Sequence, residues 1–467
     1  MSGSPRQRVR AGADPRAVAL DVLIAVRERD AYANLLLPAR LDAAGLSERD
    51  AALTTELVAG TLRMLGSYDA ILDACLRRPA KVRPVVRDIL RLGVHQLLGM
   101  RLPAHAAVHE TVELARHRAG AASVPLVNAV LRRVAGRDLA AWLAELTPPD
   151  DPLGALALRY GHPRWIVEAF AQRLPDLGDV EALLRADNEP APVHLAARPG
   201  HCEVGELVAD GARPGRWART AAILDAGAPR RIAAVREGRA RVQDEGSQLV
   251  VLALADAESA ETGRPTGWWL DLCAGPGGKT ALLAGEAARR DRRVLAVDVR
   301  PHRAALIPRD PAVRIVAADG RRGPWRPGSF DRVLLDAPCS GIGALRRRPE
   351  LRWRRSVADV RKLQEIQVAL LEAALSAVRP GGLVAYVTCS PHPDETVAVV
   401  ERVAAAVEVL DARAVLPQVP ELGPGPFIQL WPHRHGTDAM FLALLRRPSA
   451  DPQNRRSPEW ESIDSSG

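Results

Sequence analysis

The sequence predicts a multidomain chain with an all-helical bundle first, a small α+β subdomain next, and a C-terminal α/β domain with a mostly parallel, Rossmann-like sheet. Up to about residue 136, apolar residues recur at spacings of three and four, which is typical of helices. Short strand-like pieces then mix with helical ones, and beyond residue 268 apolar strands alternate with helical segments. A length of 467 residues is ample for two or three such domains.

The composition is that of a globular protein and restricts its partners only loosely. The net charge of +8 permits a nucleic-acid partner without requiring one. The five cysteines form no CxxC pair, which argues against a disulfide framework and a structural zinc site, so we expect no metal. The start lacks an apolar signal core and no stretch approaches a membrane span. We therefore expect a cytoplasmic protein that does not bind membranes, and we expect a monomer.

The first domain is predicted at residues 13–140, after a disordered start at 1–12. Arginines recur on its later helices, where a solvated face and contact with RNA both stay open. The stretches 88–98, 102–115 and 127–133 resemble the NusB family of helical RNA-binding modules. The resemblance implies a NusB-like RNA-binding bundle.

The predicted boundaries continue along the chain. Prolines predict an extended linker over 137–152, and the small α+β subdomain is placed at 150–238. The C-terminal domain is placed at 239–447, with a disordered tail at 448–467. Its first stretch, 239–248, is expected to open a helix that Ser247 caps; whether Gln243 and Asp244 shape a ligand site is left open.

The C-terminal domain is organised around Asp271-Leu-Cys-Ala-Gly-Pro-Gly-Gly-Lys-Thr280, which lies between an apolar strand and an alanine-rich helix. Strand, glycine turn and helix together are typical of a nucleotide-type ligand site. A P-loop would need glycine where Cys273 stands, and a dinucleotide fingerprint would need it at Thr280. A loop for S-adenosylmethionine (SAM) fits better, although a turn without a ligand also stays open on these residues alone.

Three further aspartates follow predicted strands, at positions where parallel strands of one sheet bring their carboxyl ends together. Asp298 lies 23 residues after Gly275 and is placed to bind ribose hydroxyls, while Asp319 is placed for an adenine amine. Asp336 follows the fourth strand. A single such aspartate is commonly a turn residue, but three in succession favour a nucleoside site.

Cys339 and Cys389 follow the fourth and fifth predicted strands, whereas Cys75, Cys202 and Cys273 fit buried apolar positions. If these two strands are neighbours, about 5 Å apart, both thiols face one crevice beside Asp336. Two thiols and a carboxylate suit methylation of a pyrimidine at C5. One thiolate adds to C6 and activates C5, and release needs a base to remove the C5 proton.

Asp336-Ala-Pro-Cys339, Thr388-Cys-Ser390 and 273–279 resemble the RNA cytosine-C5 methyltransferases of the Nop/Sun group. With the NusB-like part, residues 15–446 resemble the RsmB (Sun, Fmu) ribosomal-RNA methyltransferases, which implies small-subunit (16S) rRNA, free or partly assembled, as substrate and SAM as cofactor. Within this resemblance Cys389 is the nucleophile and Cys339 serves product release, with Asp336 and Lys279 beside them. The implied cofactor site comprises Cys273, Ala274, Gly275, Pro276, Gly277, Gly278, Lys279, Asp298, Asp319 and Asp336.

Two departures and one basic stretch concern RNA contacts. Thr396 stands where this family often has asparagine, and only Arg198 matches a usual Arg-x-Asn. The arginine-rich stretch 346–362 follows the Asp336 loop, and we expect a phosphate-gripping rim there. Two other functions stay open: a binding or assembly factor that kept the fold, and a P-loop enzyme.

Overall fold

The structure is a computed structural model that describes residues 14–100, 102–258 and 267–449. Its contacts divide the chain into two compact units. One comprises Met1–Glu168 with Arg346–Arg354, and the other comprises Ala169–Leu345 with Arg355–Gly467. The predicted disordered start and nearly all of the predicted tail lie outside the described residues, and the predicted domain boundaries remain predictions.

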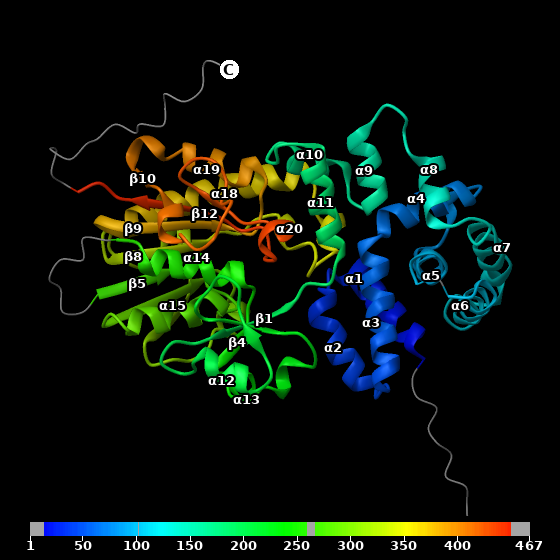
Figure 1. Cartoon of the computed structure of the whole chain (residues 1–467), viewed down its shortest axis with the longest axis horizontal. Helices are drawn as coiled ribbons and strands as arrows, with labels where there is room; N and C mark the ends of the chain where they lie inside the picture. Colours follow the sequence, from blue (N-terminus) through cyan, green and yellow to red (C-terminus); the bar gives the residue numbers. More distant parts are fainter. Residues whose placement is uncertain (1–13, 101, 259–266, 450–467) are drawn as a thin grey trace, which may run out of the picture. The chain divides into compact units, whose positions relative to one another are not determined.

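The first unit is helical, as the sequence spacing predicts. Leu20, Leu57, Ile71, Leu72 and Ile89 are fully buried in its core, because the apolar residues of each helix fall on one face. Its α-helices are α1 (Pro15–Arg29), α2 (Ala33–Ala44), α3 (Glu48–Arg63), α4 (Leu65–Cys75), α5 (Pro84–Val94), α6 (Ala104–Ala119), α7 (Val124–Val134), α8 (Leu139–Leu146) and α9 (Pro152–Tyr160) (Figure 1).

Helix α8 occupies half of the segment, 137–152, that the sequence predicted as an extended linker. The carboxylate of Asp138 caps the helix by accepting a hydrogen bond from the Ala141 N–H (2.7 Å). Trp142 is 2% exposed, and its indole N–H donates to the Val134 carbonyl (3.0 Å). The prediction failed because the prolines lie beyond this capped helix and do not interrupt it.

Helix α10 (Arg164–Ala171) continues from the first unit into the second, which begins at Ala169. Helix α11 (Leu177–Asn188) follows it in the second unit. An antiparallel sheet in the order β2-β3-β1-β4 follows. Its strands are β1 (Val193–Ala197), β2 (Arg213–Pro214), β3 (Ala221–Leu224) and β4 (Ala240–Val242), and its helices are α12 (Val204–Ala209) and α13 (Ala233–Arg236).

Strand β4 occupies the place where the sequence predicted the opening of a helix. Helix α14 (Glu245–Asp256) begins only after it, and its N-cap is Asp244, whose carboxylate accepts from the Gly246 N–H (2.9 Å). The predicted cap, Ser247, is wrong, because its hydroxyl lies within the helix, 3.9 Å from the sulfur of Met440.

The large sheet has the predicted doubly wound topology. Its order is β10-β12-β9-β8-β5-β6-β7, and neighbouring strands from β9 to β7 are parallel. These strands are β5 (Gly267–Asp271), β6 (Arg292–Asp298), β7 (Val313–Ala317), β8 (Phe330–Asp336) and β9 (Val378–Thr388). The chain runs from β5 through β6 to β7 on one side of β5 and then crosses from β7 to β8 on the other side. The direction of the strand order therefore switches at β5, and the ligand crevice is expected at the carboxyl ends near it.

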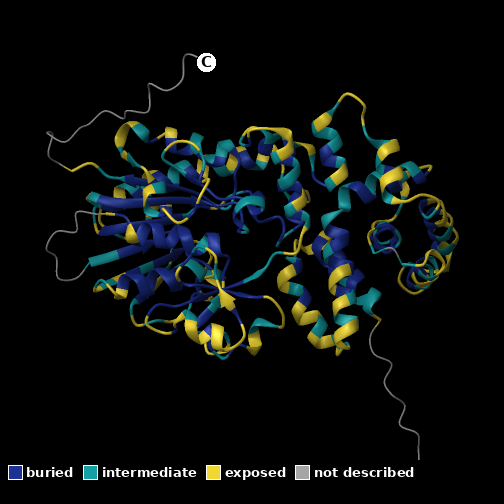
Figure 2. Cartoon of the chain, viewed as in Figure 1, coloured by how far each residue is buried: buried dark blue, intermediate teal, exposed yellow. Residues whose placement is uncertain are grey.

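Both faces of this sheet are covered, and Figure 2 shows its strands as largely buried. Along β5, Trp269 packs with α14 and α15 (Gly278–Ala288), while the next residue, Leu270, packs with α18 (Val357–Ala377) and α19 (Val397–Glu401) on the other face (Figure 1). This alternation follows from the two-residue period of a strand.

In the sequence, residues 427–431 and 440–445 predict an antiparallel hairpin at the edge of the sheet. The C-terminal strands differ from this prediction in one respect. Strands β11 (Ile428–Gln429) and β12 (Phe441–Arg446) pair antiparallel, as expected. However, β12 is not an edge strand, because it lies between β9 and β10 (Glu408–Leu410). The short strand β10 went unnoticed in the sequence because three residues carry too little periodicity.

Candidate active site

The glycine loop connects β5 directly to α15, and two of its glycines are required by geometry. Gly277 has φ +97°, a left-handed conformation that favours glycine. A Cβ on Gly275 would lie 2.5 Å from Oδ2 of Asp298, so a side chain there would collide with this carboxylate. The other predicted loop residues, Cys273, Ala274, Pro276 and Gly278, lie between β5 and the first turn of α15.

The three aspartates lie at or just after the carboxyl ends of parallel strands of the large sheet, with β5 between the strand of Asp336 and that of Asp298. Asp298 ends β6, and its two oxygens accept from the backbone N–H groups of Gly275 (3.0 Å) and Arg300 (2.8 Å). Asp319 follows β7 and is held by Arg321, whose guanidinium lowers the pKa of this carboxyl through hydrogen bonds (2.7 to 3.2 Å).

These residues fit SAM. A carboxylate accepts about four hydrogen bonds, so Asp298 keeps lone pairs for two ribose hydroxyls after binding two backbone N–H groups. Gly275 has no Cβ, which permits close approach of a ligand to the loop. The carboxylate of Asp319 is already paired with Arg321, so it would accept a hydrogen bond from an adenine amine while it keeps that ion pair.

Asp336, at the end of β8, is paired with Lys279 of the glycine loop. The Lys279 ammonium donates to Oδ2 of Asp336 at 2.8 Å. Burial disfavours the charge on Lys279, but the attraction of Asp336 outweighs burial and raises the lysine pKa. Lys279 therefore stays protonated, and its ion pair with Asp336 links the glycine loop to the end of β8.

The structure brings Cys339 and Cys389 together, with their sulfur atoms 3.4 Å apart. Strands β8 and β9 pair in parallel up to Asp336 and Val387, so both cysteines follow the same end of adjacent strands. The hydrogen bond with Cys389, together with burial, raises the pKa of the Cys339 thiol well above its ordinary value. At this distance two thiolates would repel each other strongly, so the pair holds at most one thiolate.

Cys273 has a different environment from this pair. It packs in part against the apolar cluster on the α18 face of the sheet. Burial raises the pKa of its thiol, with nearby carboxylates adding to the effect. The side chain is therefore a poor nucleophile, which agrees with its interpretation as an apolar loop residue.

A polar cluster that the sequence gave no reason to select supports the two cysteine loops. Glu395 is fully buried, and its carboxylate accepts from the Ser340 N–H (2.7 Å), the Ser340 hydroxyl and the Gln367 amide (3.2 Å). The hydroxyls of Ser340 and Ser390 lie 3.2 Å apart. Because these serines follow Cys339 and Cys389 directly, the cluster fixes the spacing of the two thiols.

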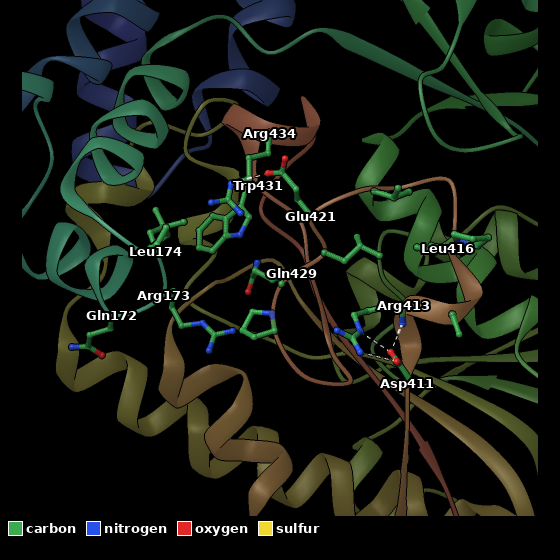
Figure 3. Close-up of a pocket in the computed structure, with 17 residues that line it drawn as sticks. Gln172, Arg173, Leu174, Asp411, Arg413, Leu416, Glu421, Gln429, Trp431 and Arg434 are labelled. Carbon is green, nitrogen blue, oxygen red and sulfur yellow. Dashed lines mark hydrogen bonds and ion pairs between the residues drawn. The ribbon is translucent and has the colours of Figure 1, made fainter. Parts of the chain in front are cut away.

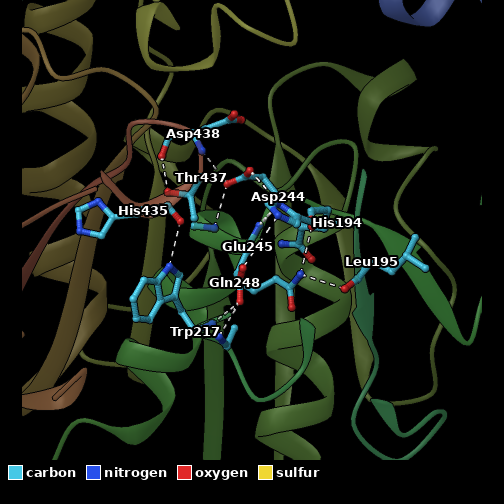
Figure 4. A network of polar contacts seen from close by, with 12 residues as sticks. His194, Leu195, Trp217, Asp244, Glu245, Gln248, His435, Thr437 and Asp438 are labelled. Carbon is cyan, nitrogen blue, oxygen red and sulfur yellow. Dashed lines mark hydrogen bonds and ion pairs between the residues drawn. The ribbon is translucent and has the colours of Figure 1, made fainter. Parts of the chain in front are cut away.

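A second polar network joins two stretches that lie far apart in the sequence, 242–248 and 430–438 (Figure 4). The Asp438 N–H donates to Asp244 (3.1 Å), and the indole N–H of Trp217 donates to the His435 carbonyl (2.9 Å). The backbone N–H groups of Trp217 and Ala218 donate to Glu245 (2.6 and 2.9 Å). The network anchors the start of α14 beside the glycine loop.

The arginine-rich stretch does not form the predicted phosphate-gripping rim. Residues 346–354 belong to the helical unit, where Arg352 is fully buried and donates to the Arg63 carbonyl at the end of α3. Arg354 donates to the Val26 and Ala31 carbonyls near the end of α1. These guanidiniums satisfy helix carbonyls. Of this stretch, Arg361 and Lys362 on α18 remain exposed.

The other two positions linked to RNA contacts are also engaged within the protein. Thr396 is fully buried, and its hydroxyl donates to the His392 carbonyl (2.9 Å). Arg198 binds the Gly238 carbonyl and Asp310 (2.8 and 2.7 Å). On the helical unit, Arg91 is tied to Asp69 and Asp88, whereas Arg101 lies outside the described residues.

A pocket of about 910 Å³ lies elsewhere in the second unit, and Figure 3 shows Arg413 paired with Asp411 on its wall. None of the predicted site residues lines it. Over residues 14–100, 102–258 and 267–449, no group of three or more His, Cys, Asp or Glu side chains is arranged to hold a metal. None of the helices in these ranges is both long enough and apolar enough to span a bilayer.

Together, the parallel sheet, the glycine loop and the carboxylate of Asp298 define a SAM-dependent methyltransferase. The family model described as 16S rRNA methyltransferase RsmB/F matches residues 261–446, and the NusB family model matches residues 13–136. The chain belongs to the 16S rRNA methyltransferase RsmB/F family, with a NusB-family region in front.

Individual relatives agree with this assignment over the whole length. Rv1407 of Mycobacterium tuberculosis, named as a methyltransferase, is 51% identical over 96% of this chain and 99% of its own. The ribosomal RNA small subunit methyltransferase B of Vibrio cholerae is 32% identical over 85% of this chain and 90% of its own. The crystal structure of a protein called PH0851 shares the fold, with a TM-score of 0.74, 22% identity, and coverage of 93% of this chain and 98% of that one.

Proposed function

We propose that this methyltransferase transfers a methyl group from SAM to C5 of a cytosine in small-subunit ribosomal RNA. The observation that carries the proposal is the pair of thiols 3.4 Å apart, at the ends of adjacent strands that also carry Asp336. The name of the Vibrio cholerae relative, ribosomal RNA small subunit methyltransferase B, supports ribosomal RNA as the substrate. Action in the cytoplasm stays a prediction.

The first step assigns the nucleophile. Cys389, as thiolate, forms a bond to C6 of the cytosine, and the π-electron pair of C5–C6 shifts toward C5 and the ring. Asp336, steadied by Lys279, supports the base by hydrogen bonding at N3 and the exocyclic amine. SAM supplies the methyl group as an electrophile, and C5 accepts it.

The second step removes the product. The Cys339 thiol first loses its own proton to solvent. Its thiolate then takes the proton from C5, the C5–C6 double bond re-forms, and the bond between C6 and the sulfur of Cys389 breaks, returning a thiolate. The hydrogen bond with Cys389 is the foremost cause that raises the pKa of Cys339. Once Cys389 is bound to C6 it no longer carries charge, so the pKa of Cys339 falls when a base is required.

Two other functions are less well supported. A binding factor without activity would have no use for two adjacent thiols beside an ion pair. A P-loop enzyme would need glycine at position 273, where Cys273 stands.

The test is methyl transfer from labelled SAM to protein-free small-subunit rRNA, with nucleoside analysis of the product. Label in 5-methylcytidine is expected from the wild type. Cys389→Ala should abolish transfer while SAM binding persists, and Cys339→Ala should trap a covalent protein–RNA adduct that shifts on a denaturing gel. Cys202→Ala, which alters a buried thiol of the small sheet, is the matched control. Full activity of Cys389→Ala would refute the proposal.

A further inference from the structure

Gln243 is a buried glutamine whose side chain has no partner. The residue is 8% exposed, and neither its amide nitrogen nor its amide oxygen makes a hydrogen bond in the described structure. Burying an amide without a hydrogen bond is unfavourable. Such a group in a native fold calls for a ligand.

The backbone around Gln243 shows that this orientation is imposed. Its N–H donates to the His194 carbonyl (3.0 Å), and its carbonyl accepts from the Gln248 side chain (3.1 Å). The next residue, Asp244, caps α14 and accepts from the Asp438 N–H. The main chain is therefore fixed on both sides, while the side-chain amide makes no hydrogen bond in the described structure.

The unpartnered amide faces the start of α15. A Cβ built on Gly278 would have the amide carbon of Gln243 at 4.0 Å and no other heavy atom within that distance. Gly278 is the first residue of an eleven-residue helix, whose first N–H groups have no intrahelical acceptor. Gly278 and Gln243 thus border a space that offers N–H donors and a helix N-terminus, both of which favour an anion.

We propose that the side-chain N–H of Gln243 donates to the carboxylate of the amino-acid end of SAM. The ribose is assigned to Asp298 beside Gly275, and the adenine to the loop after β7. The methyl group must point toward the ends of β8 and β9, where the cysteines lie. Only the amino-acid end remains for the space between Gly278 and Gln243. The inference rests on SAM as cofactor and not on the identity of the methylated base.

The test compares two ligands by isothermal titration calorimetry. S-adenosylhomocysteine carries the amino-acid end, and 5′-methylthioadenosine lacks it. Gln243→Leu should weaken S-adenosylhomocysteine binding about ten- to hundred-fold, the range for one hydrogen bond to a charged group. Binding of methylthioadenosine should stay within about two-fold of the wild type. Gln172→Leu, a change at an exposed glutamine of the same unit, should alter neither affinity.

Two further variants separate this role from a structural one. Gly278→Ala adds a methyl group for which the protein itself has room. The substitution should therefore weaken binding of S-adenosylhomocysteine and leave the melting temperature of the ligand-free protein unchanged. Gln243→Glu places a carboxylate against the ligand carboxylate. It should weaken binding of S-adenosylhomocysteine at least as much as Gln243→Leu does.

The outcomes that overturn the inference are definite. Equal losses for both ligands with Gln243→Leu would mean that the residue shapes the whole loop. Unchanged S-adenosylhomocysteine affinity would remove Gln243 from the site. Retained affinity in Gln243→Glu would contradict donation to a carboxylate. If the wild type bound neither ligand, the assignment of the glycine loop would fail together with this inference.

Discussion

Asp271 provides a pH-dependent test of how the glycine loop is built. The residue ends β5 and is fully buried, and its Oδ2 accepts from the Thr280 hydroxyl at 2.7 Å. The other oxygen, Oδ1, has no hydrogen-bond partner in the described structure. Burial raises the pKa of this carboxyl from 3.8 to about 7. Asp271→Asn gives a side chain that is neutral at every pH and still accepts from Thr280.

The sign of the pH dependence follows from the number of protons that the folded and unfolded states bind. Because the pKa is higher in the folded protein, the folded state holds a proton that the unfolded chain has already released between pH 4 and 7. The stability that Asp271 contributes is therefore complete below about pH 4 and is lost as pH rises through 7. The rise of the Asp271 pKa from 3.8 to about 7 corresponds to about 4 kcal/mol of folding free energy. The stability of Asp271→Asn minus that of the wild type should rise by up to this amount between pH 4 and 8.

The measurement is urea unfolding of both proteins without SAM at pH 4 and pH 8. Tryptophan fluorescence is the probe, because the buried Trp269 lies two residues before the substitution. Asp225→Asn, at an exposed carboxylate, is the control and should follow the wild type. If the stabilities of Asp271→Asn and the wild type change in parallel with pH, Asp271 is ionised in the fold and the reasoning is refuted.

Three further substitutions test the site and its support. Lys279→Met should slow formation of the RNA adduct on a Cys339→Ala background at least about ten-fold, because no ammonium then faces Asp336; an unchanged rate on a denaturing gel would remove the lysine from catalysis. Glu395→Ala strips Ser340 of its acceptor and should destabilise the second unit by about 3 kcal/mol or more; urea unfolding checks this, and a loss below about 1 kcal/mol would contradict it. Arg352→Met leaves a buried helix carbonyl without its donor and should lower the melting temperature by several degrees, whereas an unchanged melting temperature would show that this contact is dispensable.

The sequence alone determined the features that depend on short stretches. The strand, glycine turn and helix around 271–280 were readable because each needs only local residues and their period. The doubly wound order followed from alternating strands and helices, and it placed Cys339 and Cys389 on adjacent strands before any distance was known. The roles of these cysteines remain predictions.

Tertiary structure decided whatever depends on contacts between distant residues. The arginines at 346–354 look like a free basic rim in the sequence, since charge there says nothing of burial, yet the fold places Arg352 against the end of α3. In the sequence, Glu395 looks like an ordinary loop carboxylate. Only the packing shows that it is buried and hydrogen-bonded to Ser340. For Gln243 the sequence left a role in shaping a ligand site open, and only the fold shows the state of its side chain. His194 and Gln248 fix its backbone by hydrogen bonds, and its buried side-chain amide is left without a hydrogen-bond partner. Hydrogen bonds between residues many positions apart follow from packing and not from local sequence.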